Sequence, residues 1–233
     1  MARAAFLTGL LVILVAAVAV FRQAPGPGAP RDRIVPATRP APEQLSVVAF
    51  GTSLTARAVW PAELGARLAG CGFAAASVTV RAQPGAGSAA GRDLVGAEGP
   101  GPFNVALIEF AINDADLIDG VSQAASLQNH RAIIRALRSR HPDIAIVLLT
   151  TNPVAGLQRL KRPKLMAYGD IYVQLAAGEG VSLFDGTARW LDEGSGGQAL
   201  VDGLHPEPGL EARLYARPLA ETVARIFGRS CTP

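Results

Sequence analysis

The segment LSVVAFGTSL, residues 45–54, passes from a mostly apolar run directly into a short polar turn. The same change recurs three times further along the chain. Apolar runs at 78–82, 105–110 and 181–184 precede Pro84-Gly85-Ala86-Gly87, Ala111-Ile112-Asn113-Asp114 and, after a long loop, Asp202-Gly203-Leu204-His205. Parallel strands of an α/β sheet end at one edge, where the loops that follow them form a crevice. The four polar segments are therefore predicted to meet at one site.

Apolar runs alternate with helical patterns along the rest of the chain. Strands are predicted at 45–50, 75–82, 105–110, 144–149 and 181–184. Helices are predicted at 58–69, 122–140, 163–177 and 210–227, the last bent or broken at Pro218. The Gly- and Pro-rich residues 84–102 are expected to be a long loop with one helical turn near 89–95. This alternation predicts a five-stranded parallel sheet in a three-layer α/β/α sandwich.

The composition fits one globular domain and disfavours nucleic acid as a partner. The chain has 233 residues, 49% of them hydrophobic, and a net charge of only +3. Setting aside the first forty or so residues leaves about 190, which suits one α/β domain. The small positive excess is thinly spread, so it does not form the basic patch that nucleic acid requires.

The first residues predict export from the cytoplasm. Residues 4–21 are uncharged and mostly apolar, and about eighteen residues is near the minimum for a membrane-spanning helix. Ala17-Val18-Ala19 also fits a signal-peptide cleavage site. We expect residues 1–23 to be a membrane anchor or a cleaved signal peptide, 24–43 a Pro/Gly-rich linker and 44–233 the folded domain. Either choice predicts an extracytoplasmic protein, in the periplasm or at the cell surface.

The polar segments supply the parts of a nucleophilic site. A serine such as Ser53 attacks only when a base takes its proton; otherwise it is a helix N-cap. His205 is the candidate base, because His130 lies on the polar side of a predicted helix and His141 ends that helix. Asp202 can accept from one ring nitrogen of His205 and leave the other facing Ser53. The alternative is a loop aspartate beside a helix-capping histidine.

Attack on an ester carbonyl makes an oxyanion, and hydrogen-bond donors must already point at it. Three donors are candidates: the backbone N–H groups of Ser53 and Gly85 and the side-chain amide of Asn113. A glycine lets the main chain approach a substrate closely, and an asparagine amide is a neutral donor. The alternatives are a plain turn at Gly85 and an Asx-turn at Asn113.

These residues resemble the four sequence blocks of the SGNH hydrolases, also called GDSL-type esterases and lipases. Gly51-Thr52-Ser53-Leu54 looks like the Gly-Asp-Ser-Leu block with Thr in place of Asp, and Asp202-x-x-His205 matches the last block. Gly85 and Asn113 match the second and third. Two departures leave every catalytic group in place: Ala111 replaces the usual glycine, and Gln83-Pro84 stands where an asparagine often precedes the second-block glycine. The resemblance spans residues 45–228.

The resemblance implies a flavodoxin-like fold, no metal and no cofactor. It assigns Ser53 as nucleophile, His205 as base, Asp202 as its orienter and Ser53, Gly85 and Asn113 as the oxyanion hole. The expected substrate is an acyl ester: a lipid, a small ester or an O-acetylated glycan. Hydrolysis is the first interpretation, and an O-acyltransferase or deacetylase acting on envelope or extracellular glycans is the alternative. A non-catalytic, envelope-anchored binding module is a third, which the intact set of four groups disfavours.

Three other features remain open. In a flavodoxin-like order, Cys71 and Cys231 end helices on one face, at the edge opposite the crevice, so we expect a disulfide worth roughly 4–5 kcal/mol by chain entropy rather than two free thiols. Trp60 and Trp190 are candidates to line an acyl pocket, although core packing is the simpler interpretation at Trp60. A basic cluster after the fourth strand is either a solvated loop or a lip for an anionic substrate or membrane headgroups. It consists of Arg159, Lys161, Arg162 and Lys164.

Overall fold

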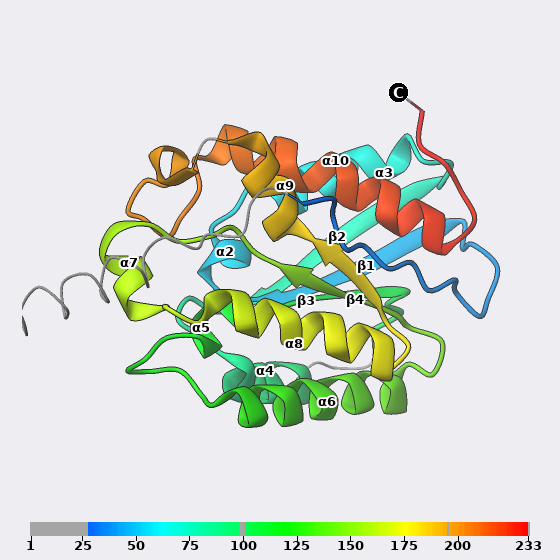
Figure 1. The fold of residues 1–233 in the computed structure, drawn as a ribbon. Coiled ribbons are helices and arrows are strands. Elements are labelled where there is room, and N and C mark those ends of the chain that lie inside the picture. The colour runs from blue at the N-terminus through cyan, green and yellow to red at the C-terminus, as the bar shows by residue number, and fades with distance from the viewer. Residues whose placement is uncertain (1–27, 98–100, 195, 233) are drawn as a thin grey trace, which may run out of the picture.

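A computed structural model of the chain describes residues 28–97, 101–194 and 196–232 (Figure 1). The predicted anchor or signal peptide, residues 1–23, lies outside the described residues, as does the start of the linker. Within those three ranges, no helix has the length and apolar character needed to cross a bilayer.

The centre of the molecule is a sheet of five parallel strands in the order β2-β1-β3-β4-β5. The strands are β1 (Gln44–Gly51), β2 (Ala75–Ala82), β3 (Val105–Glu109), β4 (Ala145–Thr150) and β5 (Ser182–Asp185). All of β3 is buried, whereas β2 at the sheet edge is partly exposed. The strands predicted from the apolar runs are therefore confirmed, with small shifts at their ends, and so is the parallel α/β fold.

Helices cover both faces of the sheet, which confirms the three layers (Figure 1). One face carries α3 (Trp60–Ala69), α9 (Gly186–Glu193) and α10 (Pro208–Ile226). The other carries α4 (Ser88–Ala97), α6 (Gln123–Arg140) and α8 (Leu165–Gly178). Alternate strand residues face the two layers: Val47 packs toward α3 and α10, and Val48 packs toward α6 and α8.

Several loops of the sequence interpretation contain helix. The additional elements are α2 (Ser53–Ala56), α5 (Ala111–Asp114), α7 (Gly156–Lys161), η1 (Gly196–Ala199) and α9, and α4 is far longer than one turn. Gly91 lies in α4 where the helix packs closely on the sheet, because a Cβ there would lie 2.6 Å from the Phe110 ring. This glycine serves close packing of a helix on the sheet rather than a loop. Helix α10 also continues through Pro218 instead of breaking, held by the fully buried Leu219 and Val223.

The predicted disulfide is present: Cys71, just after α3, is bonded to Cys231, after α10. The sequence separation of 160 residues makes it a long loop closure. A backbone hydrogen bond from Thr232 to the carbonyl of Gly70, 3.1 Å long, continues the same junction. The bond joins the two helices at the sheet edge opposite the predicted crevice.

The prediction that His130 lies on the polar side of its helix, in contact with solvent, is wrong, because this side chain is fully buried. Its Nδ1 lies 2.8 Å from the carbonyl of Ser126, and its Nε2 lies 2.9 Å from the hydroxyl of Tyr172. Burial lowers the pKa of His130, which favours the neutral ring. The Tyr172 hydroxyl in turn accepts the N–H of Phe110 at 2.9 Å. His130 is thus part of the support beneath the segment that carries Asn113.

Candidate active site

The turn that carries Ser53 is fixed by the residues on either side of it. Thr52 caps α2, accepting the N–H of Leu54 at 3.1 Å, and Ser53 is the first helical residue. Strand β1 ends at Gly51, where a Cβ would come within 2.3 Å of the Thr55 hydroxyl, so only glycine fits. Ser53 retains 8% exposure at the crevice edge of the sheet.

Glu109 anchors this turn, and the sequence interpretation missed it. The last residue of β3 pairs in register with Gly51, which puts its carboxylate beside the next residue, Thr52. Its Oε2 accepts the Thr52 N–H at 3.1 Å, the Thr52 hydroxyl at 2.8 Å and the Thr55 hydroxyl at 3.2 Å. Thr52 is a double donor here, whereas an aspartate at that position would set a second carboxylate against Glu109. The only sequence signal was a charged residue inside the apolar run 105–110.

The structure brings Ser53, His205 and Asp202 together in one line. Nε2 of His205 lies 2.9 Å from Oγ of Ser53, and Nδ1 lies 2.8 Å from Oδ2 of Asp202. With the Nδ1 proton donated to Asp202, Nε2 is free to accept from the serine hydroxyl. The alternative of an unrelated loop aspartate and capping histidine does not describe this arrangement.

The Asp202 carboxylate also holds its own loop. Its Oδ1 accepts the backbone N–H groups of Leu204 at 3.0 Å and His205 at 2.8 Å. Partial burial by itself would raise the pKa of Asp202, but these bonds and the imidazole lower it to about 2. Gly203 has φ of +79° and lies against the carbonyl of Ala155, so this turn requires glycine. The carboxylate therefore stays ionised at neutral pH.

The three predicted oxyanion donors lie on the segments that follow β1, β2 and β3. Among the bonds that the structure shows for the described residues, none uses the N–H of Ser53 or of Gly85. Gly85 has φ of +81°, and the space where a Cβ would stand is open. Asn113 donates one amide hydrogen to the carbonyl of Ala86 at 3.0 Å, which leaves the second hydrogen unused.

Arg162 departs from the prediction of a solvated loop or lip, because its side chain is only 7% exposed. Its Nε donates to the carbonyl of Ile112 at 2.8 Å, and its Nη2 lies 3.0 Å from Oδ2 of Asp116. The same nitrogen is 3.4 Å from Oδ1 of Asn113. Arg162 therefore clamps the Asn113 turn, and its contact with Oδ1 sets the orientation of the amide.

Asn152, directly after β4, is a second residue that the sequence interpretation missed. It is buried, and its Nδ2 donates to the carbonyls of Leu204 at 2.8 Å and Pro153 at 2.9 Å. This bond supports the loop of His205 from below. The signal was present as Thr150-Thr151-Asn152, a polar triplet that ends an apolar strand at the crevice edge.

A small cavity of about 10 Å³ lies under the serine turn, bounded by Glu109, Trp60, Glu211 and Tyr215. That volume is close to the space of a single water molecule, so it cannot receive an acyl group. Burial raises the pKa of Glu109 to about 7 and that of Glu211 to about 8. Trp60 and Trp190 are both core residues, buried to 3% and 1% exposure.

A metal has no candidate site in the part of the chain that the structure describes, because no three His, Cys, Asp or Glu side chains cluster suitably there. The groups that the structure brings together at the site are a serine hydroxyl, an imidazole, carboxylates and amide donors. This set, at the carboxyl edge of a five-stranded parallel sheet, defines a hydrolase of the α/β sandwich class.

Comparison with known proteins identifies the family. Residues 46–209 match the model of the GDSL-like lipase/acylhydrolase family. The chain belongs to this family, whose members are SGNH hydrolases that act on acyl esters. A search of curated proteins returned no match.

Solved structures share the fold at low sequence identity. A lipase/acylhydrolase from Enterococcus faecalis is 18% identical, with a TM-score of 0.65 over 81% of this chain and 99% of that one. An acetylxylan esterase from Geobacillus stearothermophilus, crystallised as a catalytic mutant, is 16% identical, with a TM-score of 0.64 over 79% and 94%. The aryl esterase of M. smegmatis is 15% identical, with a TM-score of 0.60 over 78% and 99%.

Proposed function

We propose that this protein hydrolyses carboxylic esters through a covalent acyl-enzyme formed on Ser53. The observation that carries the proposal is the contact of 2.9 Å between Nε2 of His205 and Oγ of Ser53, backed by the contact of 2.8 Å between Nδ1 and Asp202. These are hydrogen-bond distances for a serine, its base and the group that orients the base.

The reaction takes two symmetrical steps. His205 Nε2 takes the proton of Ser53 as Oγ attacks the carbonyl carbon, and the ionised Asp202 stabilises the imidazolium. The intermediate collapses when His205 gives that proton to the departing alcohol, which leaves the acyl group on Ser53. Water then gives a proton to His205 and attacks the acyl carbon. Return of the proton to Oγ releases the carboxylic acid and restores the site.

The oxyanion of each intermediate is assigned to the N–H groups of Ser53 and Gly85 and the remaining amide hydrogen of Asn113. Support comes from their unused donors and from the contacts that orient Asn113. Removing one such donor typically costs about 3–4 kcal/mol of transition-state stabilisation.

The proposed location is extracytoplasmic, with residues 4–21 as an uncleaved anchor or a removed signal peptide. Two observations support it: the apolar run itself and the disulfide between Cys71 and Cys231. Disulfides persist in oxidising compartments and are rare in the cytosol.

A second candidate is an O-acyltransferase or deacetylase that acts on envelope or extracellular glycans. The observation that favours it is the fold shared with two carbohydrate-directed enzymes, the acetylxylan esterase and a carbohydrate acetylesterase from Sinorhizobium meliloti. The same acyl-enzyme serves both reactions, and only the acceptor differs. A transferase would turn over slowly in water and accelerate when a glycan acceptor is added.

The test compares the full chain with its Ser53→Ala variant on chromogenic acetyl, butyryl and octanoyl esters and on acetylated xylooligosaccharides. We expect wild-type hydrolysis and a loss of at least about a thousandfold in the variant. Ser139→Ala, at an exposed position on α6, is the matched control and should keep full activity. Fluorophosphonate labelling with peptide mapping should place the adduct on Ser53. Equal rates for wild type and Ser53→Ala would refute the proposal.

A further inference from the structure

The most exposed apolar side chains among the described residues lie on segments around the active-site crevice. Seven large apolar side chains are exposed in the described ranges, and two of them, Val59 and Val80, are only 39% and 38% exposed. The other five range from 53% to 78%. They are Leu117, Ile118, Leu157, Leu160 and Val201, here called the apolar rim.

The apolar rim is one continuous feature built from three adjoining segments. The N–H of Leu117 donates to the carbonyl of Lys161 at the end of α7, at 2.9 Å. The N–H of Ala155, before α7, donates to the carbonyl of Gly203 at 2.8 Å. The N–H of Val201 donates to the carbonyl of His205, also at 2.8 Å. Figure 1 shows α5, α7 and the loop before α10 at the same end of the molecule.

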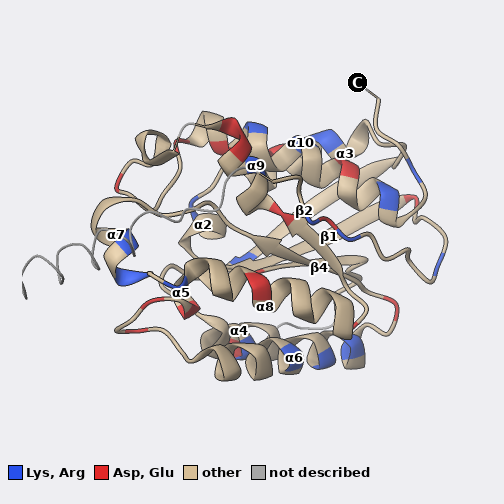
Figure 2. Ribbon diagram, in the orientation of Figure 1, with Lys and Arg blue, Asp and Glu red and all other residues tan. Residues whose placement is uncertain are grey.

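Cations stand among these apolar side chains. Arg159, Lys161 and Lys164 are exposed, and no described carboxylate lies within ion-pair distance of any of them. The neighbouring loops carry acidic residues, coloured red on the ribbon near the blue of α7 in Figure 2. Of these, Asp116 is paired with Arg162, whereas Asp119, Asp202 and Glu207 are exposed, and Asp202 faces His205. The three cations lie beside Leu157 and Leu160 on a segment, 156–169, that has no acidic residue, so this part of the rim is both apolar and cationic, the combination that favours an anionic lipid surface.

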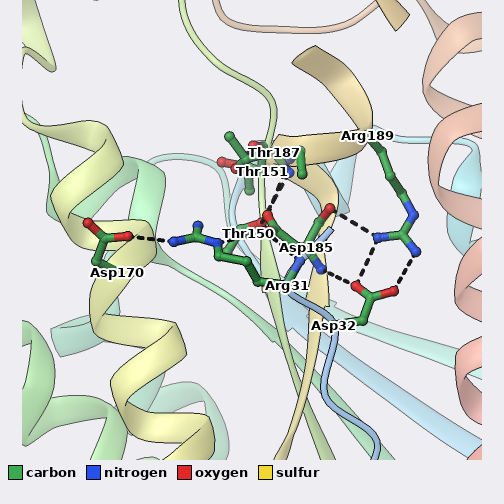
Figure 3. A network of polar contacts seen from close by, with 9 residues as sticks. Arg31, Asp32, Thr150, Thr151, Asp170, Asp185, Thr187 and Arg189 are labelled. Atoms are coloured by element: carbon green, nitrogen blue, oxygen red, sulfur yellow. Dashed lines mark hydrogen bonds and ion pairs between the residues drawn. The ribbon is translucent and has the colours of Figure 1, made fainter. Parts of the chain in front are cut away.

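The N-terminal segment enters the domain at this same edge. Arg31 binds Asp185, the last residue of β5, with Nε 2.9 Å from Oδ2, and also reaches Asp170 at 2.7 Å (Figure 3). Asp32 binds Arg189 on α9 at 2.5 Å. This described part of the predicted linker is therefore pinned at the carboxyl ends of the strands. The apolar run ends at residue 21, and the seven residues from there to Gly28 reach at most about 25 Å.

The geometry points to a membrane-docking surface: the apolar rim, with Arg159, Lys161 and Lys164, seats on a lipid bilayer that carries anionic headgroups. The apolar side chains enter the headgroup boundary, and the three cations meet lipid phosphates. A membrane anchor at 4–21 holds the crevice edge within reach of the surface, so the site opens toward the bilayer rather than away from it. The inference goes beyond the proposed function, because docking requires no turnover.

The test places a fluorescent reporter on the rim. Leu157→Trp is suitable because Leu157 is 76% exposed, while the native Trp60 and Trp190 are buried. Ser139→Trp, at the exposed end of α6 and the opposite sheet edge, is the matched control. Both are made in the full chain carrying Ser53→Ala and reconstituted into vesicles of phosphatidylcholine and phosphatidylglycerol with brominated acyl chains. Both keep residues 1–27, so any anchor contributes equally.

We expect the Leu157→Trp chain to lose about half of its added emission, because a docked interfacial side chain enters roughly 5–10 Å into the bilayer. The Ser139→Trp chain should lose none. Reversing the charges with Arg159→Glu, Lys161→Glu and Lys164→Glu should reduce the quenching of the Leu157→Trp chain to that of the Ser139→Trp control. Circular dichroism of each chain checks that the fold is kept.

Equal quenching at both positions, or none at either, overturns the proposal, since a domain that tumbles on its tether gives that result. Quenching that survives both the charge reversals and vesicles of phosphatidylcholine alone overturns the role of anionic headgroups. A shift of the Leu157→Trp emission with protein concentration in detergent, without vesicles, overturns the bilayer as occupant and indicates a second copy of the chain.

Discussion

Glu109 holds the residue before the candidate nucleophile, accepting both the N–H and the hydroxyl of Thr52 on one carboxylate oxygen. The serine turn is therefore fastened to the neighbouring strand rather than only to its own. A nucleophile must sit within a fraction of an ångström of its productive position, so this attachment belongs to the machinery of the site although Glu109 touches no substrate.

The expected effect of Glu109→Ala is a fall in kcat of between about tenfold and a hundredfold, with little change in KM, because Ser53 loses its fixed geometry. Thr52→Val, which removes one of the two donors, should give a smaller fall. If Glu109 acts through Thr52, the double variant is no worse than Glu109→Ala alone. Additive losses in this cycle, measured with one ester, would contradict a positioning role.

The contact between Asp202 and Nδ1 of His205 predicts that this carboxylate fixes the tautomer of the imidazole, and Asp202→Asn tests this without changing shape. The amide nitrogen turned toward Nδ1 forces the proton onto Nε2, which then cannot accept from Ser53. We expect kcat to fall by about a thousandfold to ten-thousandfold while the chain stays folded. Steady-state kinetics, with thermal unfolding as the check on structure, measures both. A variant that is less than tenfold slower would mean that the orientation of His205 does not depend on this carboxylate.

The fold was predictable because its strands are long apolar runs between glycine-rich turns. The carboxyl ends of three of those runs lead directly into the segments of Ser53, Gly85 and Asn113, since parallel strands deliver their loops to one edge. The length of helix α4 was underestimated, as one turn near 89–95, because Gly91, which suggests a loop, serves close contact with Phe110. His130 was misplaced because α6 is covered by both α4 and α8 and buries a wider arc than its apolar residues mark.

The supporting residues of the site were not predictable in the same way. Glu109 looks like one charge in a strand, and its partner Thr52 looks like a departure from the family motif. Only the register that pairs Gly51 with Glu109 shows that the two compensate. Asn152 and Arg162 likewise act through backbone carbonyls of distant loops, and a carbonyl leaves no mark in the sequence.

The disulfide should stabilise the fold without touching the chemistry. Replacing Cys71 and Cys231 together by alanine removes a cross-link between residues 160 apart, so the unfolded chain gains conformational entropy. We expect a loss of roughly 2–5 kcal/mol in the free energy of unfolding and a lower Tm. The activity below the transition should be unchanged, because the bond lies at the edge opposite the site. Reductant should lower the Tm of the wild type and leave that of the double variant where it was.

The buried Glu211 makes stability depend on pH. Burial raises its pKa to about 8, so between about pH 4.5 and 8 the folded chain keeps a proton that the unfolded chain has released. The stability that Glu211 contributes is fully present below its pKa in the unfolded chain and is lost as the pH rises through its folded-state pKa of about 8. Glu109, with a pKa of about 7, also makes the folded chain less stable as the pH rises, and its effect is complete at a lower pH than that of Glu211.

We therefore expect the free energy of unfolding to fall by a few kcal/mol between about pH 5 and about pH 9, since each unit of pKa shift is worth about 1.4 kcal/mol. Glu211→Gln, which cannot ionise, should flatten much of this slope. Urea unfolding of both chains across that range measures the difference. Parallel curves would show that Glu211 is charged in the folded chain at neutral pH. The comparison does not depend on catalysis, so it tests the buried cluster beneath Ser53 by itself.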